Sequence, residues 1–197
     1  MTQSIQVIVH RVESLDDVEH MGKNDPYVQL TTDLAEKESF KKTTVKKNAG
    51  RNAEYEEHLT LENFQPQHDN YLYVEVLESD VGIDPPIGFT AIPMFQVTEA
   101  PQHALKGTFQ LYTPSGKEKG TVTLSIFIVA PGQPAPQIQL HEVRGKTEIV
   151  SEQKKRIETM KTNEKINDVG AAAAILGALY GAKKMHDASK KPKNIEA

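Results

Sequence analysis

The alternation of apolar and polar residues along the first 130 residues constrains the fold of this chain most strongly. In the first such segment, Ile5, Val7 and Val9 alternate with the residues between them. A period of two places successive side chains on opposite faces of a strand, and β-branched and aromatic residues favour that structure. About eight segments follow this pattern, namely residues 5–9, 27–30, 40–47, 55–61, 71–77, 87–95, 107–112 and 120–129.

Turn-forming residues separate these segments. Gly, Pro, Asn and Asp gather at residues 24–26, 50–52, 68–70 and 114–116, and each of these residue types favours a tight change of chain direction. Many short strands at regular spacing, with turns between them, are typical of an antiparallel sandwich or barrel. The sequence therefore predicts an all-β fold.

Two groups of acidic residues lie at the ends of predicted strands. The first contains Glu19 and Asp25, and the second contains Glu78, Asp80 and Asp84. Ca²⁺ takes about six to eight oxygen ligands, mostly carboxylates and carbonyls, in a flexible cage. If both loops lie at one end of a sandwich, these five side chains predict a calcium site. The alternative is that they are ordinary polar loop residues, because Asp-Pro is a common turn.

Three segments around these clusters resemble the C2 domain, a calcium- and phospholipid-binding β-sandwich. GKNDPYVQL (residues 22–30) resembles the family's signature around its second strand, and residues 72–94 resemble its third calcium loop with both flanking strands. TTVKKNAGRNAEYEEHLTL (residues 43–61) is similar to its K-T-x-V…N-P-x-W-N-E-x-F stretch. The resemblance covers residues 4–129. It implies an eight-stranded antiparallel C2-type sandwich, in the permutant whose first strand leads directly into the first calcium loop.

The resemblance also assigns the calcium ligands residue by residue. Asp25 is the carboxylate of the Asp-Pro-Tyr signature. Glu19 and Glu78 stand where the family usually has Asp, and Asp80 completes its Asp-x-Asp pair. Asp84 lies one residue before the family's fifth acidic position, in a loop one residue shorter. These departures imply a weakened affinity for Ca²⁺, one ion in place of two, or no physiological binding.

If Ca²⁺ binds, the membrane mechanism is electrostatic. Divalent ions reverse the negative sign of the acidic loops and bridge to an anionic headgroup. The apolar tips of the loops, Met21, Val81 and Ile83, then insert into the membrane interface. The alternative for each tip is ordinary loop packing, and that alternative is strongest for Met21.

A basic strand and turn provide a second route to lipid. Lys42, Lys46, Lys47 and Arg51 lie close together in the sequence, and the corresponding strand of C2 domains often binds phosphoinositides. Each lysine near an anionic leaflet contributes on the order of 1 kcal/mol. The alternative is an edge strand that its lysines protect from aggregation.

Composition divides the chain at a proline-rich segment. We expect a C2 domain over residues 1–130, a stiff linker over 131–137 and a helical or partly disordered tail over 138–197. Residues 1–130 carry 11 Lys and Arg against 19 Asp and Glu, whereas residues 131–197 carry 12 against 8. Residues 170–182 are apolar but too few to span a bilayer. Gly177 and Gly181 form a G-x-x-x-G pair, so this segment predicts self-association, a docked helix or a contact with the membrane interface.

Other functional classes find little support in the sequence. The seven histidines form no H-x-x-x-H pair, and the chain has no Gly-rich phosphate loop, no G-x-S-x-G motif and no cysteine. The lysine-rich end lacks the interleaved aromatic residues of a nucleic-acid-binding surface. No signal peptide is apparent. We therefore expect a non-enzymatic, cytoplasmic module that Ca²⁺ recruits to anionic phospholipid, or alternatively a calcium-independent module that binds proteins.

Overall fold

The computed structural model describes residues 2–19 and 22–162. The chain divides into two compact units, Met1–Lys161 and Thr162–Ala197, and the strands belong to the first. Short helical turns are η1 (Lys37–Ser39), α1 (Phe95–Thr98) and η2 (Pro101–His103). The strands are β1 (Gln3–Glu13), β2 (Pro26–Thr31), β3 (Lys41–Lys42), β4 (Ala53–Phe64), β5 (Tyr71–Glu78), β6 (Pro86–Pro93), β7 (Ala104–Tyr112), β8 (Glu118–Val129) and β9 (Glu142–Arg144).

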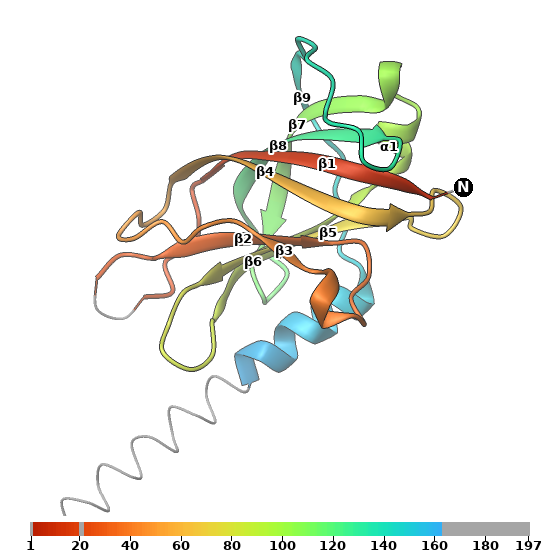
Figure 1. The fold of residues 1–197 in the computed structure, drawn as a ribbon. Coiled ribbons are helices and arrows are strands. Elements are labelled where there is room, and N and C mark those ends of the chain that lie inside the picture. The colour runs from red at the N-terminus through yellow and green to blue at the C-terminus, as the bar shows by residue number, and fades with distance from the viewer. Residues whose placement is uncertain (1, 20–21, 163–197) are drawn as a thin grey trace, which may run out of the picture. The chain divides into compact units, whose positions relative to one another are not determined.

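Eight of these strands form an antiparallel sandwich. Their order is β3-β2-β5-β6-β7-β8-β1-β4, and β6 and β7 are joined by only one residue pair, Phe89 with Tyr112. We call β3-β2-β5-β6 the first sheet and β7-β8-β1-β4 the second sheet (Figure 1). The predicted antiparallel C2-type sandwich is confirmed. β8 lies beside β1, as the permuted strand order predicts.

The core between the two sheets follows from the alternation in the sequence. Val7 and Val9 of β1 and Val74 and Val76 of β5 are fully or almost fully buried in it. Burying one such side chain stabilises the fold by about 1.5–3 kcal/mol. The residues between them face away from this core, so each sheet has an inner and an outer face.

One predicted strand is much shorter than expected. The sequence predicts a strand over residues 40–47, but β3 contains only Lys41 and Lys42. The regular pairing ends at Thr43, because the Val28 amide donates to the Thr43 hydroxyl at 3.0 Å rather than to a carbonyl, although the amides of Thr43 and Lys46 still donate to carbonyls of β2. The next amide, that of Thr44, donates to the side-chain carboxylate of Glu57 at 2.8 Å rather than to a backbone carbonyl.

Residues 142–148 close the opening between β6 and β7. β9 pairs in parallel with β7, and Glu148 forms an isolated bridge with Ala91 of β6. A Cβ atom on Gly145 would overlap the ring of Phe109. The segment can therefore approach the sandwich this closely only because residue 145 is glycine.

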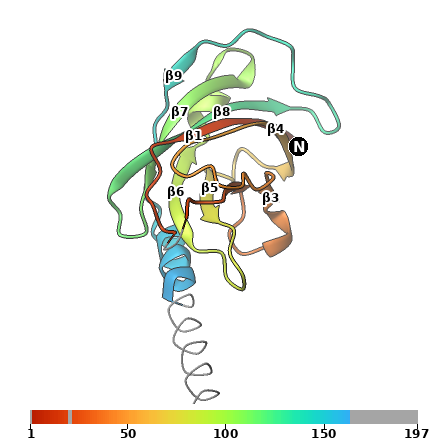
Figure 2. The ribbon, with the colours of Figure 1, turned by 90° about the vertical axis from the view of Figure 1, so that its left-hand side faces the viewer.

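A helix over residues 151–162 covers the outer face of the first sheet (Figures 1 and 2). Two side chains of this helix, Gln153 and Ile157, are fully buried. Arg156 pairs with the buried carboxylate of Glu75 at 3.0 Å, and its guanidinium carbon lies 4.6 Å from the ring centroid of Phe40. The outer face of the first sheet is buried at Tyr27, Gln29, Glu75, Leu77, Phe89 and Ala91.

Residues 138–161 thus belong to the same compact unit as the sandwich. The boundaries that we expect at 130 and 137 stay a prediction. The apolar segment 170–182, with Gly177 and Gly181, lies outside the described residues. Within the described residues, no helix has the length and apolar composition needed to cross a membrane.

Candidate functional site

Two acidic loops lie at the same end of the sandwich. One connects β1 to β2 and the other connects β5 to β6, on the left in Figure 1 and toward the viewer in Figure 2. β2 and β5 pair directly, and Pro26 lies opposite Glu78 in their register. This pairing places Asp25 beside the first acidic residue of the second loop.

Asp25 and Glu78 are joined through the backbone. The amide of Asp25 donates to both carboxylate oxygens of Glu78, at 2.8 and 2.9 Å. The amide of Ser79 donates in turn to the carbonyl of Asp25 at 3.2 Å. Glu78 is only 2 % exposed, so its charge lies in a poorly solvated position.

The pKa of Glu78 reflects how close the other acidic side chains lie. Its pKa is raised to about 7, first by burial and then by the negative charges of Asp25, Glu19 and Asp80, whereas the hydrogen bond from the Asp25 amide opposes the shift. A like charge raises a carboxyl pKa only when it lies nearby. Four of the five predicted ligands therefore share one electrostatic environment that disfavours further negative charge.

A lysine partly compensates this charge. Lys47 places its ammonium 3.0 Å from Oδ2 of Asp25, and the amide of Asn48 donates to Oδ1 of the same carboxylate at 2.5 Å. The hydrogen bond from Asn48 and the charge of Lys47 lower the pKa of Asp25. Asp25 thus stays ionised with both of its oxygens engaged by protein groups.

The remaining two acids belong to the second loop. Oδ1 of Asp84 accepts a hydrogen bond from the amide of Asp80 at 3.2 Å, and Oδ2 accepts one from the hydroxyl of Tyr27 at 2.6 Å. Asp80 is exposed, and its Oδ1 accepts from the next amide, that of Val81, at 2.6 Å. Burial, together with Asp84, raises the pKa of Tyr27.

The carboxylates are near one another without converging. Among residues 2–19 and 22–162, no three Asp, Glu, His or Cys side chains are arranged to hold a metal ion. Their oxygens are the hard donors that Ca²⁺ prefers, so the chemistry of the donor set fits the ion. The oxygens of Asp25, Glu78 and Asp84 are directed to protein donors instead.

Of the three predicted loop tips, one is clearly presented to solvent. The side chain of Val81 is 100 % exposed. Ile83 is half-buried, and Met21 lies outside the described residues. An apolar side chain held fully in water at a loop tip is available for insertion into an apolar phase.

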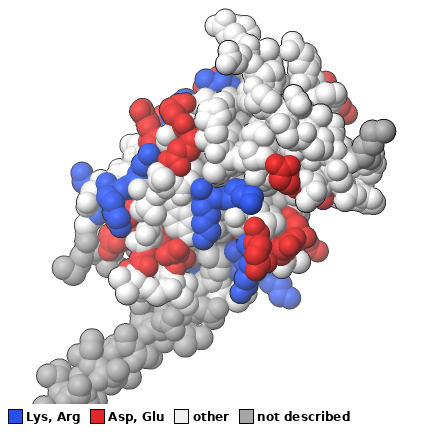
Figure 3. All heavy atoms as spheres, in the orientation of Figure 1, with Lys and Arg blue, Asp and Glu red and all other residues white. Residues whose placement is uncertain are grey.

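Each of the four predicted lipid-binding residues has a partner on the protein. Lys42 lies 5.3 Å from the ring centroid of Tyr27, and Lys46 pairs with Glu57 at 3.3 Å. Lys47 pairs with Asp25, and Arg51 lies 3.9 Å from Asp17. Figure 3 shows the result, since Lys and Arg side chains are interspersed with Asp and Glu on this side of the molecule.

The residue that organises the first loop is absent from the predicted set. Asn24 is fully buried; its Oδ1 accepts from the amides of Val18 and Glu19 at 3.2 and 3.3 Å, and its Nδ2 donates to the carbonyl of Asp16 at 2.8 Å. The signal was present, because an Asn directly before Asp-Pro is a side chain that commonly bonds to the backbone of its own turn.

Comparisons with known proteins agree with this fold. The family model of the C2 domain matches residues 3–111. The first C2 domain of plant extended synaptotagmin 1 is 24 % identical over 67 % of this chain and 98 % of its own length, with a TM-score of 0.55. The two C2 domains of extended synaptotagmin 2, calcium bound, are 18 % identical over 64 % of this chain and 45 % of theirs, with a TM-score of 0.53.

An enzyme also contains a similar domain. Human GIVD cytosolic phospholipase A2 is 16 % identical over 76 % of this chain but only 19 % of its own length, with a TM-score of 0.53. A search of curated proteins found no match to this chain. At these identities the solved structures establish the fold alone.

Proposed function

This chain belongs to the C2 domain family, and from that membership we propose that it is a peripheral membrane-binding module that Ca²⁺ recruits to anionic phospholipid. The observation that carries the proposal is the pairing of β2 with β5, which brings Asp25 of the first acidic loop against the buried carboxylate of Glu78 in the second. The raised pKa of Glu78, caused by burial and by the nearby charges of Asp25, Glu19 and Asp80, agrees with this crowding. Such crowding favours binding of a cation, since a positive ion offsets the repulsion.

The residues that would hold the ion are Asp25, Asp80 and Asp84, with Glu19 and Glu78 adding negative charge. Bound Ca²⁺ supplies positive charge and open coordination positions for headgroup oxygens. Glu78 already accepts the Asp25 amide with both oxygens, so its main contribution is to fix the Asp25 backbone. Lys47 neutralises part of the charge when the ion is absent.

Membrane contact would use the same end of the molecule. Val81 is fully exposed beside these acids and would enter the interface together with Ile83. Lys42 and Arg51 extend the basic surface away from the loops, although their present partners, the ring of Tyr27 and the carboxylate of Asp17, reduce their free charge.

The second candidate function is calcium-independent binding to a protein partner. The observation that favours it is the ion pair between Lys47 and Asp25 at 3.0 Å. The ammonium of Lys47 already lies beside the carboxylate of Asp25. In the described part of the chain, no group of three acidic, histidine or cysteine side chains is arranged to hold a metal ion. In this case the loops are stable without metal.

Co-sedimentation with vesicles distinguishes the two functions. The full chain is mixed with phosphatidylserine-containing liposomes in Ca²⁺ or in chelator, as wild type and as the double variant Asp25→Asn with Asp80→Asn. The matched control is Asp33→Asn with Asp69→Asn. Both control residues bond to local amides in loops at the other end of the sandwich, so this variant changes the same charge without touching the acidic loops.

Calcium-dependent pelleting that the loop variant loses and the control variant keeps supports the first proposal. Pelleting that is equal in Ca²⁺ and in chelator moves the membrane contact away from the acidic loops. If neither condition gives pelleting, the calcium-independent protein-binding function is favoured.

A further inference from the structure

Three polar side chains form a hydrogen-bonded chain across the outer face of the second sheet. Nε2 of His10 lies 2.8 Å from Oγ of Ser125, and Nδ1 of the same ring lies 2.9 Å from Oε2 of Glu56. They come from three adjacent strands, β8, β1 and β4. A hydroxyl bonded to an imidazole that is bonded to a carboxylate is the arrangement that activates a serine nucleophile, whatever the fold.

The backbone is irregular at this point in both supporting strands. The register of β1 shifts between Val9 and Arg11 against β4 and also against β8. On β4, Glu56 has a φ of 50°, a left-handed conformation that side chains other than Gly, Asn and Asp rarely adopt. Bulges redirect side chains, and such conformations cluster at functional sites. Here they aim His10 and Glu56 at each other.

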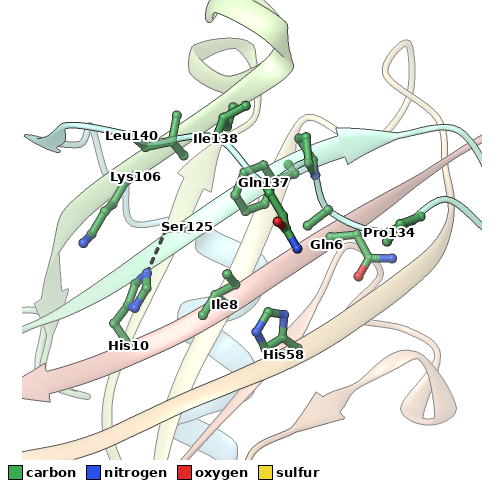
Figure 4. A pocket seen from close by; sticks show the side chains of 13 residues that line it. Gln6, Ile8, His10, His58, Lys106, Ser125, Pro134, Gln137, Ile138 and Leu140 are labelled. Atoms are coloured by element: carbon green, nitrogen blue, oxygen red, sulfur yellow. Dashed lines mark hydrogen bonds between the residues drawn. The ribbon is translucent and has the colours of Figure 1, made fainter.

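A cavity adjoins the serine. It has a volume of about 480 Å³ and is lined by Ser125 and His10 together with the apolar side chains of Ile8, Phe127 and Ile138. Ser125 itself is 4 % exposed. Figure 4 shows the segment that carries Ile138 passing over the strand that bears Ser125. A pocket of this size with apolar walls and a few polar groups suits a small organic ligand.

A positive group stands next to the serine in the same cavity. Lys106 lies directly opposite Ser125 in the register of β7 and β8, and its side chain also lines the cavity. Its ammonium is 3.8 Å from Oε2 of Glu142, so it stays near this face. A cation beside a nucleophile stabilises the negative oxygen that forms during acyl transfer.

From this geometry we propose that Ser125, His10 and Glu56 form a nucleophilic site that hydrolyses small carboxylic esters with an apolar acyl group. In the tautomer with its proton on Nδ1, His10 donates to Glu56 and accepts from Ser125. Oγ of Ser125 bonds to the ester carbonyl carbon, its proton passes to Nε2 of His10, and the C=O electron pair moves to the carbonyl oxygen. Collapse then breaks the carbon–alkoxy bond, and the alcohol leaves with the proton from Nε2.

Water completes the cycle. It attacks the acyl-serine carbonyl while His10 accepts its proton, and breaking the bond to Oγ releases the acid and returns the proton to Ser125. The net reaction is ester plus water to acid plus alcohol. Lys106, opposite Ser125 on the neighbouring strand, would supply positive charge for the oxyanion in both steps. This activity is separate from membrane binding, because none of its residues belongs to the acidic loops.

The test uses the full chain in chelator, so that Ca²⁺ plays no part. Hydrolysis of p-nitrophenyl butyrate is followed, and an alkyl fluorophosphonate is used to label the nucleophile, with intact mass and peptide mapping as readouts. The variants are Ser125→Ala and His10→Gln. The matched controls are His68→Gln, an exposed histidine in the loop between β4 and β5 and outside this cavity, and Ser4→Ala, a buried serine of β1 bonded to a carboxylate rather than to histidine.

We expect a single fluorophosphonate adduct on Ser125, and hydrolysis that falls about 100-fold in either site variant and stays unchanged in both controls. Cooperative unfolding of each variant shows that it is folded, and His10→Gln answers the question if Ser125→Ala is not. Hydrolysis that survives both site variants, or a wild-type chain that takes no adduct, overturns the proposal.

Discussion

Glu78 combines two requirements that conflict at neutral pH. It anchors the backbone of Asp25 through two hydrogen bonds, yet it lies buried among other negative charges. Its pKa rises from 4.5 to about 7 for these reasons. Between these two values the folded chain holds a proton that the unfolded chain has released, so this group's contribution to stability decreases as pH rises from about 4.5 through about 7.

Replacing this residue should therefore change the pH dependence of stability. In Glu78→Gln the amide oxygen still accepts from the Asp25 amide, and no charge is buried. We expect the free energy of unfolding of the variant, relative to that of wild type, to be higher at pH 8 than at pH 5 by up to about 3 kcal/mol. Urea unfolding at the two pH values measures this. An equal difference between the proteins at both pH values would contradict a raised pKa.

Lys47 offers a second test at the level of one side chain. Its ammonium competes with any cation for Asp25, but the Lys47 side chain is exposed, so solvent screens the pair and keeps it weak. Lys47→Met should tighten Ca²⁺ binding about two- to fivefold, as expected from an exposed pair of about 0.5–1 kcal/mol. Isothermal titration calorimetry of the ion alone gives the affinity. Lys46→Met, which removes a partner of Glu57 instead, should leave that affinity unchanged.

Individual site residues were predictable from the sequence only in part. The positions of the acidic residues could be predicted, because their spacing from the predicted strands shows in which loop each carboxylate lies. The contacts of Lys47 and Asn48 with Asp25 could not, because they depend on how the turn at residues 48–50 folds back over the first loop. There, Gly50 donates to the carbonyl of Asn24 at 2.9 Å. Strand periodicity contains no information about such a contact.

At the scale of elements, the alternation of apolar and polar residues predicts every strand of the sandwich. It does not predict the C-terminal segment that packs on the outer face of the first sheet. Residues 87–92 of β6 are buried on both faces, whereas a strand with one wet face alternates. This nearly continuous apolar run was a signal that something covers the outer face of the first sheet. The cover comes from residues 145–161. Their charged composition suggested a tail, because within the helix only Gln153, Arg156 and Ile157 need to face inward.

A substitution at Gly145 tests whether the C-terminal segment packs on the sandwich through specific contacts. In Gly145→Ala the new methyl group would collide with the ring of Phe109, and overpacking of this kind costs about 1–3 kcal/mol. We expect that loss in urea unfolding, with faster hydrogen exchange in β9. The control is Gly88→Ala, whose methyl group would meet Leu111 at an ordinary 3.5 Å, so its stability should stay within about 1 kcal/mol of wild type. Equal effects of the two variants would show that residue 145 does not fix the segment.

Considered as a whole, the molecule is a sandwich that needs its C-terminal cover. Glu75 is fully buried and depends on Arg156 and Gln29 for its hydrogen bonds. Removing one partner of a buried ion pair costs about 3–5 kcal/mol. Any chain that ends before the helix loses the Arg156 partner of Glu75 and the buried side chains of Gln153 and Ile157.

Two shortened chains make this prediction concrete. A chain of residues 1–162 should unfold cooperatively with a free energy close to that of the full chain. A chain of residues 1–130 should lose at least about 3 kcal/mol and should bind the dye ANS, which reports exposed apolar surface. Equal stability of the two shortened chains would mean that the sandwich does not depend on its cover.

The position of this cover in the sequence has a consequence for biosynthesis. All eight strands of the sandwich are synthesised before the helix over residues 151–162, so they also emerge from the ribosome before it. At synthesis rates of about 5–20 residues per second, the nascent chain presents a bare apolar sheet face for a few seconds. During that interval the exposed face is open to chaperones and to aggregation. The interval ends when the helix has formed and packed on the sheet.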